Sequence, residues 1–177
     1  MKIVDDFRVK GKWLYGEESQ KSFFRSLCSD ASLSMVLFRS MDFFNTHLVT
    51  KPLAAVICKL NAILCGAVIG CGASFGRGFV ILHSVGVVIN KKTCAGCNVV
   101  IESGVVIGEE KQGCPVLGND IFIGSGAKVF GGITIGDNVT IGANAVVNKS
   151  FPSDVVIGGV PARILLHKKS NQATAKL

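Results

Sequence analysis

The sequence predicts a mainly β protein, a parallel β-helix of six-residue repeats that follows a short α-helical region. Three observations predict this fold: aliphatic residues recur every six positions from Ile69, Gly often follows them directly, and the first 66 residues show helical spacing instead. A six-residue period matches neither an α-helix nor an alternating strand. It fits a coil of short strands, in which each hexad forms one flat side and then turns a corner.

The inward-facing residues of the hexads are expected to keep one phase over about thirteen repeats, with a single break at Lys111. Gly and Asn suit the corners, because positive φ angles cost them least. A β-sandwich with regular turns would not keep one phase over this length, so we favour the solenoid. The predicted inward residues are Ile69, Phe75, Ile81, Val87, Thr93, Val99, Val105, Leu117, Ile123, Val129, Ile135, Ile141 and Val147.

The chain is expected to divide into a helical region at 1–66, the β-helix at 67–166 and a basic tail at 167–177. Apolar residues at three-to-four spacing predict helices over 21–27 and 33–44, with Asp30 or Ser32 as the cap of the second. Pro52 predicts the start of a third helix, since Pro is tolerated in a first helical turn. Gly66 predicts its end.

The most apolar stretch covers residues 52–70 and contains Lys59 and Asn61. Its length is close to that of a membrane span, but we favour a helix that packs on the open end of the solenoid as a cap. No secretory signal is visible at the start of the sequence, so we expect a cytoplasmic protein, with contact to the inner face of the membrane as an alternative. Five Phe residues are expected to share the capping role: Phe23, Phe24, Phe38, Phe43 and Phe44.

The net charge of +7 favours an acidic partner such as a phosphorylated cofactor. Nucleic acid is not expected as a partner, because no basic stripe with interleaved aromatic residues is present. The seven cysteines are an odd number spread through apolar sequence, which indicates reduced thiols rather than a disulfide framework. Cys94 and Cys97 have no second ligand pair nearby, so no metal is expected.

Three segments resemble the hexapeptide-repeat acyltransferases, and in particular their serine-acetyltransferase-like subgroup. The segments are 81–90, 117–147 and 158–163, the last of which contains Gly-Val-Pro-Ala-Arg. The resemblance implies a left-handed coil, acetyl-CoA as the acyl donor and a homotrimer with its site between subunits. The subgroup also contains O-acetyltransferases of colanic acid and other bacterial surface polysaccharides, and the sequence resembles those most closely.

Among the three histidines, His83 alone interrupts an apolar run, at 79–82. A lone histidine in such a run is often a core residue, but its place matches the catalytic histidine of the family. The resemblance therefore implies that His83 is the general base, a role that suits histidine near neutral pH. The activated hydroxyl would attack the thioester of acetyl-CoA directly, without a covalent enzyme intermediate.

Two departures from the serine enzymes bear on this site. The acidic residue that orients the histidine in those enzymes is replaced by Val68 here, so a backbone carbonyl or another subunit would have to orient His83. The charged groups that hold free serine are replaced by Leu82, Gly113 and Cys114, which cannot supply charge-assisted hydrogen bonds. We therefore expect a sugar hydroxyl as acceptor, with Leu82, Asn90 and Cys114 as substrate-binding residues.

The resemblance also implies a binding surface for CoA. Small residues would let the backbone approach the pantetheine, and cations would meet the phosphates. The expected CoA-binding residues are Gly108, Ser125, Gly126, Ala143, Lys149 and Arg163.

Three functions stay open from the sequence. The first is sugar O-acetylation in bacterial surface-polysaccharide synthesis. The second is serine O-acetylation in cysteine biosynthesis. The third is a non-catalytic hexapeptide-repeat scaffold, which the replacement at Val68 keeps in play.

Overall fold

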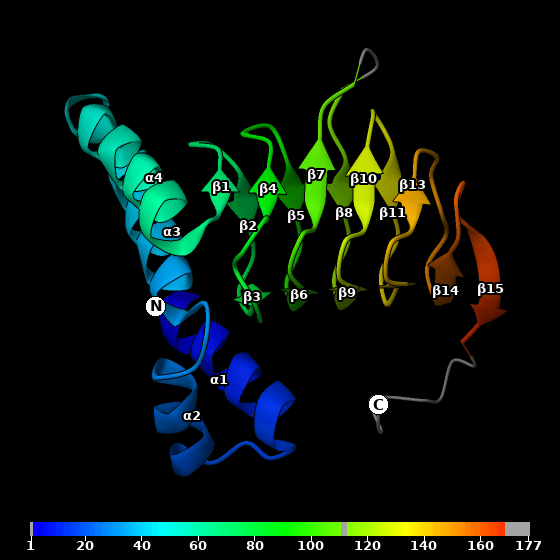
Figure 1. Cartoon of the computed structure of the whole chain (residues 1–177), viewed down its shortest axis with the longest axis horizontal. Coiled ribbons are helices and arrows are strands. Elements are labelled where there is room, and N and C mark those ends of the chain that lie inside the picture. Colours follow the sequence, from blue (N-terminus) through cyan, green and yellow to red (C-terminus); the bar gives the residue numbers. More distant parts are fainter. Residues whose placement is uncertain (1, 111–112, 169–177) are drawn as a thin grey trace.

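The computed structural model describes residues 2–110 and 113–168, so most of the predicted tail and the predicted break at Lys111 lie outside the described residues. The described chain begins with four α-helices, α1 Lys2–Tyr15, α2 Gln20–Leu27, α3 Ser32–Phe44 and α4 Lys51–Cys65, with a short 3₁₀ turn at Leu48–Thr50 (Figure 1). Fifteen short strands follow: β1 Val68–Ile69, β2 Ser74–Phe75, β3 Val80–Ile81, β4 Val88–Ile89, β5 Cys94–Ala95, β6 Val99–Ile101, β7 Val106–Gly108, β8 Val116–Leu117, β9 Ile121–Ile123, β10 Lys128–Phe130, β11 Thr134–Ile135, β12 Thr140–Ile141, β13 Val146–Val147, β14 Val155–Gly158 and β15 Arg163–His167.

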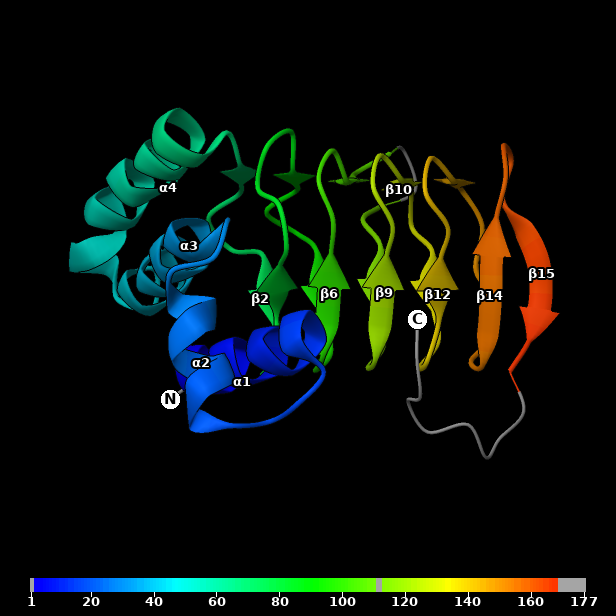
Figure 2. The same ribbon diagram turned by 60° about the horizontal axis from the view of Figure 1, so that its bottom comes forward.

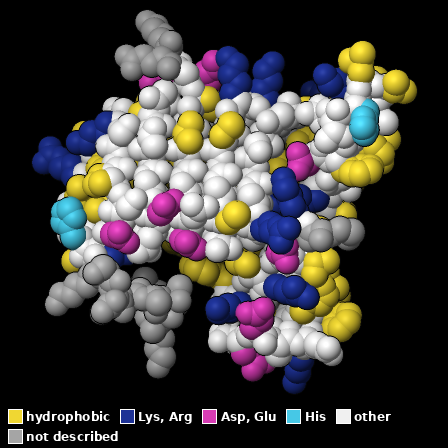
Figure 3. All heavy atoms as spheres, turned by 180° about the vertical axis from the view of Figure 1, so that it is seen from behind, with side chains coloured by type: hydrophobic (Ala, Val, Ile, Leu, Met, Phe, Trp, Pro, Cys, Tyr) yellow, Lys and Arg dark blue, Asp and Glu magenta, His cyan; other side chains and the backbone are white. Residues whose placement is uncertain are grey.

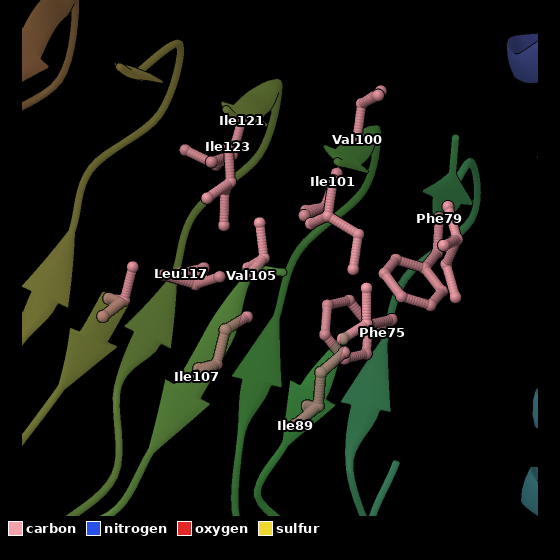
Figure 4. Packing of buried hydrophobic residues seen from close by; sticks show 14 of the residues in the cluster. Phe75, Phe79, Ile89, Val100, Ile101, Val105, Ile107, Leu117, Ile121 and Ile123 are labelled. Atoms are coloured by element: carbon pink, nitrogen blue, oxygen red, sulfur yellow. The ribbon is translucent and has the colours of Figure 1, made fainter. Parts of the chain in front are cut away.

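The strands form three sheets that make the sides of a parallel β-helix, which confirms the predicted fold class. The sheet orders are β1-β4-β7-β10-β13, β2-β5-β8-β11 and β3-β6-β9-β12-β14-β15, and only the last pair, β14 and β15, is antiparallel. The inward residues of successive coils stack on one another in the interior (Figure 4). Each predicted inward residue is at most 2% exposed.

The single phase predicted for the hexads is wrong between Ile81 and Leu117. Ile69 pairs with Ile89, twenty positions later, and Ile107 pairs with Val129, twenty-two positions later, whereas an unbroken coil needs eighteen. Two extra residues therefore lie between β3 and β4, and four lie between β7 and β8. Together they make one hexad, so the phase returns. In the intervening coils the strand residues that stack are shifted by two positions, to Ile89, Ala95, Ile101 and Ile107.

The helices gather at one end of the solenoid, against its first coil (Figure 2). Phe38 of α3 packs on two coil residues, with ring centroids 5.8 Å from Phe75 and 5.1 Å from Phe79. Helix α1 extends along the outside of the coil, where Trp13 stacks on Phe122 of β9 at 5.1 Å. The predicted capping role therefore holds for Phe38, whereas Phe24 and Phe43 are 64% and 68% exposed.

Helix α4 is only partly covered. The helical stretch Leu48–Cys65 is long and apolar enough to cross a membrane by length and composition, and 17% of it is buried inside the molecule. Figure 3 shows hydrophobic side chains gathered over the helical end of the molecule. Ile63, Leu64 and Val56 of α4 are among the exposed apolar residues.

Candidate active site

His83 lies on the turn that the first insertion creates. The Leu82 N–H still pairs with the Ile101 carbonyl at 3.0 Å, and the chain rejoins the coil at Val85 and Gly86, where the Gly86 N–H donates to Gly66 O at 3.0 Å. The two extra residues make this excursion possible, because an unbroken hexad would turn the corner at once. The His83 side chain is 59% exposed as a result.

Asp30 meets His83 from the helical region. Its Oδ2 lies 2.7 Å from His83 Nδ1, although the two residues are 53 positions apart. This hydrogen bond is the main reason why the pKa of Asp30 lies below its ordinary value. Because an ionised carboxylate only accepts hydrogen bonds, Nδ1 carries the proton in the neutral ring, and Nε2 keeps its lone pair.

The segment that carries Asp30 is held from two sides. Asp30 Oδ1 accepts a hydrogen bond from the Ala31 N–H at 2.7 Å. The Asp30 carbonyl accepts one from Nζ of Lys10, a fully buried residue of α1 that also donates to Ser32 Oγ at 3.2 Å. Burial lowers the pKa of Lys10 to about 8, although the charge of Asp30 opposes this.

The prediction that Asp30 or Ser32 caps α3 is wrong, because both side chains bond to other partners. Ala31 is the N-cap residue of α3, in a left-handed conformation, and no side chain caps the helix. The Asp30 carboxylate bonds to His83 instead, and Ser32 Oγ donates to the Ser26 carbonyl at 2.7 Å.

Part of the predicted CoA surface follows the corner on which His83 lies. Ser125 and Gly126 occupy this corner two coils further on, and Ala143 follows in the next coil. Arg163 comes near its far end, where the neighbouring Ala162 N–H donates to Val146 O at 2.8 Å. The corner is connected by three backbone hydrogen bonds, Gly104 N to Val85 O, Gly126 N to Ser103 O and Asn144 N to Ser125 O.

The other predicted residues lie elsewhere. Asn90 follows β4 and Gly108 is the last residue of β7, so both lie at the opposite end of these strands from the His83 corner. Cys114 Sγ lies 3.4 Å from Thr93 Oγ1 in the second insertion, and Lys149 Nζ lies 5.5 Å from the ring centroid of Phe151. The Leu82 side chain is buried, at 5% exposure.

Two further features bear on the chemistry. Within residues 2–110 and 113–168, no three His, Cys, Asp or Glu side chains form a group that could hold a metal ion. An apolar hollow on the surface is lined by α1 and α3 residues that include Ile3, Val36 and Phe43, and it includes neither Asp30 nor His83.

Asp30 is the site residue that the sequence argument missed. The residue pattern of its segment predicts only a helix cap, and the resemblance expects the partner of His83 in the coil or in a neighbouring subunit. The signal that was available is that Asp30 and Asp42 are the only acidic residues between 19 and 66. With Val68 in the expected acidic position, each of them was a candidate carboxylate.

Comparisons with known proteins agree with this geometry. A family model described as bacterial transferase hexapeptide (six repeats) matches residues 114–149. A serine acetyltransferase of Synechococcus elongatus is 39% identical over 114 residues, which cover 62% of this chain and 47% of that protein. A serine acetyltransferase of Helicobacter pylori is 39% identical over 117 residues, covering 64% and 68% of the two chains. The chain thus spans about half to two thirds of the length of these relatives.

Two solved structures extend the similarity to the helical region. The serine acetyltransferase of Brucella abortus in complex with coenzyme A has a TM-score of 0.82 at 24% identity, over 94% of this chain and 68% of that one. The soybean serine acetyltransferase complexed with serine has a TM-score of 0.78 at 25% identity, over 93% and 68%.

The fold and the exposed histidine on its inserted turn define a hexapeptide-repeat transferase. More narrowly, the chain belongs to the serine acetyltransferase family. The predicted subgroup and the prediction of an acyltransferase are thereby confirmed at the level of the family, which agrees with acetyl-CoA as the predicted donor. The predicted closeness to colanic-acid and capsule enzymes is not supported by these relatives.

The prediction of a sugar hydroxyl as acceptor, in surface-polysaccharide synthesis, is wrong. These relatives and both structures are serine acetyltransferases, which favours the serine alternative. Leu82, Gly113 and Cys114 supply no charged side chain for free serine. The helical region, however, brings the Asp30 carboxylate to His83.

Proposed function

We propose that this protein transfers the acetyl group of acetyl-CoA to the hydroxyl of L-serine, with His83 as the general base. The observation that carries the proposal is the exposed His83 side chain, whose Nδ1 lies 2.7 Å from Asp30 Oδ2; a carboxylate there assigns the proton of the neutral ring to Nδ1 and the lone pair to Nε2. A histidine held in one tautomer beside a carboxylate is the arrangement that activates a hydroxyl in acyl transfer. The family relationship supports the donor and the acceptor.

The step requires three events at His83. Nε2 takes the proton of the serine hydroxyl while the hydroxyl oxygen attacks the carbonyl carbon of the thioester. The bond from that carbon to the CoA sulfur then breaks. The imidazolium returns the proton to the departing thiolate, so that O-acetylserine and CoA leave and the enzyme is regenerated. No covalent bond to the protein forms.

Charge at the site supports serine as the acceptor. The serine ammonium carries a positive charge, and the exposed Asp30 carboxylate lies beside the base that its hydroxyl must reach. An ionised carboxylate forms strong charge-assisted hydrogen bonds with an ammonium group. Asp30 is therefore placed to attract the substrate as well as to meet His83.

The CoA-binding residues belong to the same proposal. Ser125, Gly126, Ala143 and Arg163 follow the corner that begins at the His83 turn, so a donor bound along it would bring its thioester toward His83. Gly108, Lys149, Asn90, Cys114 and Leu82 stay predictions from the resemblance.

We extend the proposal to assembly and location. The flat sides of the coil and the exposed apolar residues of α4 support association into a homotrimer. A cytoplasmic location gives access to acetyl-CoA, and the apolar surface of α4 would allow contact with the inner face of the membrane.

The function is tested by release of CoA from acetyl-CoA, followed with a thiol reagent against an enzyme-only blank. We expect release with L-serine, little release with D-serine or glycerol, and loss of release in His83→Ala. His167→Ala is the matched control, because His167 is an exposed histidine at the end of β15. Activity that survives in His83→Ala, or that needs no serine, would overturn the proposal.

A further inference from the structure

The place where the resemblance expects an acidic residue is apolar in this chain. Val68 begins β1 and is 49% exposed. Valine can neither accept a proton nor orient an imidazole. The coil therefore supplies the base without the group that should fix its tautomer.

The helical region supplies a carboxylate at that ring. Asp30 Oδ2 lies at hydrogen-bonding distance from Nδ1, and Oδ1 is already occupied by the Ala31 N–H. The Asp30 charge also raises the pKa of the Cys65 thiol at the end of α4, in addition to the effect of burial. The turn that carries its partner His83 also contacts the end of α4, because the Gly86 N–H donates to the carbonyl of Gly66, the C-cap of α4, at 3.0 Å.

The orientation of Asp30 is fixed by hydrogen bonds among the neighbouring helices α1, α2 and α3. Lys10 Nζ reaches from α1 to the Asp30 carbonyl and to Ser32 Oγ. Ser29 and Ser32 both donate to the Ser26 carbonyl, at 2.6 and 2.7 Å. These bonds join α1, α2 and α3 around one residue, so the aim of the carboxylate depends on the packing of three helices.

We propose that Asp30 is the positioning residue for His83 and replaces, from the helical region, the acidic residue that position 68 lacks. This inference rests on the proposed role of His83 as base. The helical region is then a working part of the site as well as a cap, because Lys10 and the serines around Asp30 hold the carboxylate against the coil. A negative charge at Nδ1 also stabilises the imidazolium that forms as the hydroxyl loses its proton.

The contacts make a sharp prediction for Asp30→Asn. The side-chain oxygen is expected to stay with the Ala31 N–H, so the amide NH₂ faces His83 Nδ1 as a donor. Nδ1 must then accept, which places the ring proton on Nε2 and removes the lone pair that the serine hydroxyl needs. Because general-base catalysis contributes on the order of 100-fold or more, we expect kcat to fall about 100-fold, with the KM for acetyl-CoA unchanged.

The matched variants separate positioning from folding. Asp30→Glu keeps the carboxylate and is expected to restore part of kcat. Asp42→Asn makes the same chemical change on α3, where the carboxylate pairs with Lys2 at 3.4 Å and does not meet His83. It is expected to keep wild-type kcat. Circular dichroism melts of all three variants check that the fold is intact, since Asp30 is 62% exposed.

The tautomer itself is read by nitrogen NMR of protein labelled in its three histidines. We expect the wild-type His83 signal to show a protonated Nδ1, and Asp30→Asn to show a protonated Nε2. This readout does not depend on turnover. A wild-type protein with the Nδ1-protonated ring but no CoA release with serine would overturn the proposed function and leave the positioning contact in place. An active wild-type protein whose tautomer and kcat are unchanged in Asp30→Asn would overturn the inference.

Discussion

The helical region and the coil bury different kinds of side chain. In the described part of the coil, the interior is aliphatic and aromatic, and Ser84 and Thr93 are its buried polar residues. The helical region buries three charged side chains, Asp6, Lys10 and Arg39. Apolar stacking can repeat from coil to coil, whereas buried charges need particular partners in a particular arrangement. The coil is therefore a regular frame, and the helical region sets the geometry around His83.

Loss of the buried ion pair in the helical region is expected to have the largest effect. Asp6 accepts hydrogen bonds from Arg39 Nε at 2.6 Å and Nη2 at 3.0 Å, and from the N–H groups of Gly78 at 2.8 Å and Phe79 at 2.9 Å. Asp6→Ala leaves a buried guanidinium without its partner. We expect the free energy of unfolding to fall by about 3 to 5 kcal/mol, measured by urea denaturation followed by circular dichroism.

Asp5→Ala is the control for this prediction. Asp5 is partly exposed, and its ion pairs with Arg8 and Arg77 are 3.6 and 3.7 Å long, so its loss is expected to cost less than about 1 kcal/mol. Replacing both Asp6 and Arg39, as Asp6→Ala with Arg39→Met, should recover part of the loss, because no buried charge is left alone. Equal costs for Asp5→Ala and Asp6→Ala would remove the distinction between the two regions.

In the coil, the close approach of successive turns is expected to limit substitution. A Cβ atom at Gly118 would lie 2.8 Å from the carbonyl carbon of Gly136 and 2.9 Å from the nitrogen of Asp137. Gly118→Ala must therefore separate two coils, and we expect a cost of about 1 to 3 kcal/mol. At Gly108 the nearest atom is Phe130 Cβ at 3.9 Å, so Gly108→Ala should unfold like the wild type. A similar loss in both variants would show that coil spacing does not explain the effect.

Lys10 gives the stability of the helical region a pH dependence of its own. Its pKa is about 8 in the folded protein, against 10.5 as the ordinary value. Between these values the unfolded chain binds more protons, so stability rises with pH across this window, and below it the buried ammonium costs stability. We expect the stability of the wild type relative to Lys10→Met to rise by up to about 1 kcal/mol per pH unit. Denaturation of both proteins from pH 7 to pH 10 measures this, and a constant difference would contradict it.

The regular coils could be predicted from the sequence because the same rule, a buried residue every six positions, holds in each coil. Ile69, Phe75 and Ile81 are all buried at the predicted six-residue spacing. The rule indicated a break only at Lys111 and could not reveal the first insertion, because Val87, Thr93 and Val99 are apolar or small and also buried. A shift of two positions moves from one buried residue of a hexad to another, so the pattern looks unbroken from Ile81 to Val105.

The sequence predicted His83 but not its partner Asp30, and the reason differs from that for the first insertion. His83 stood out because it interrupts an apolar run. Its partner Asp30 lies 53 positions earlier, on a segment between two helices, and nothing in the spacing of residues indicates that contact. It depends on how α1, α2 and α3 pack, and Lys10, which fixes that packing at Asp30, reads in the sequence as an ordinary surface lysine.

The smallest effects are expected at the corner of the coil that we propose for CoA. Arg163 is exposed at the start of β15, so a contact with a CoA phosphate would be screened by solvent and salt. We expect Arg163→Met to raise the KM for acetyl-CoA about fivefold, the equivalent of about 1 kcal/mol for an exposed charge pair, and more strongly at low salt. The value of kcat and the melting temperature should not change. Lys21→Met, an exposed lysine on α2, is the control. The Asp30 variants are expected to change kcat and leave this KM alone, so a fall in kcat for Arg163→Met would mean that the coil takes part in the chemistry beyond binding the donor.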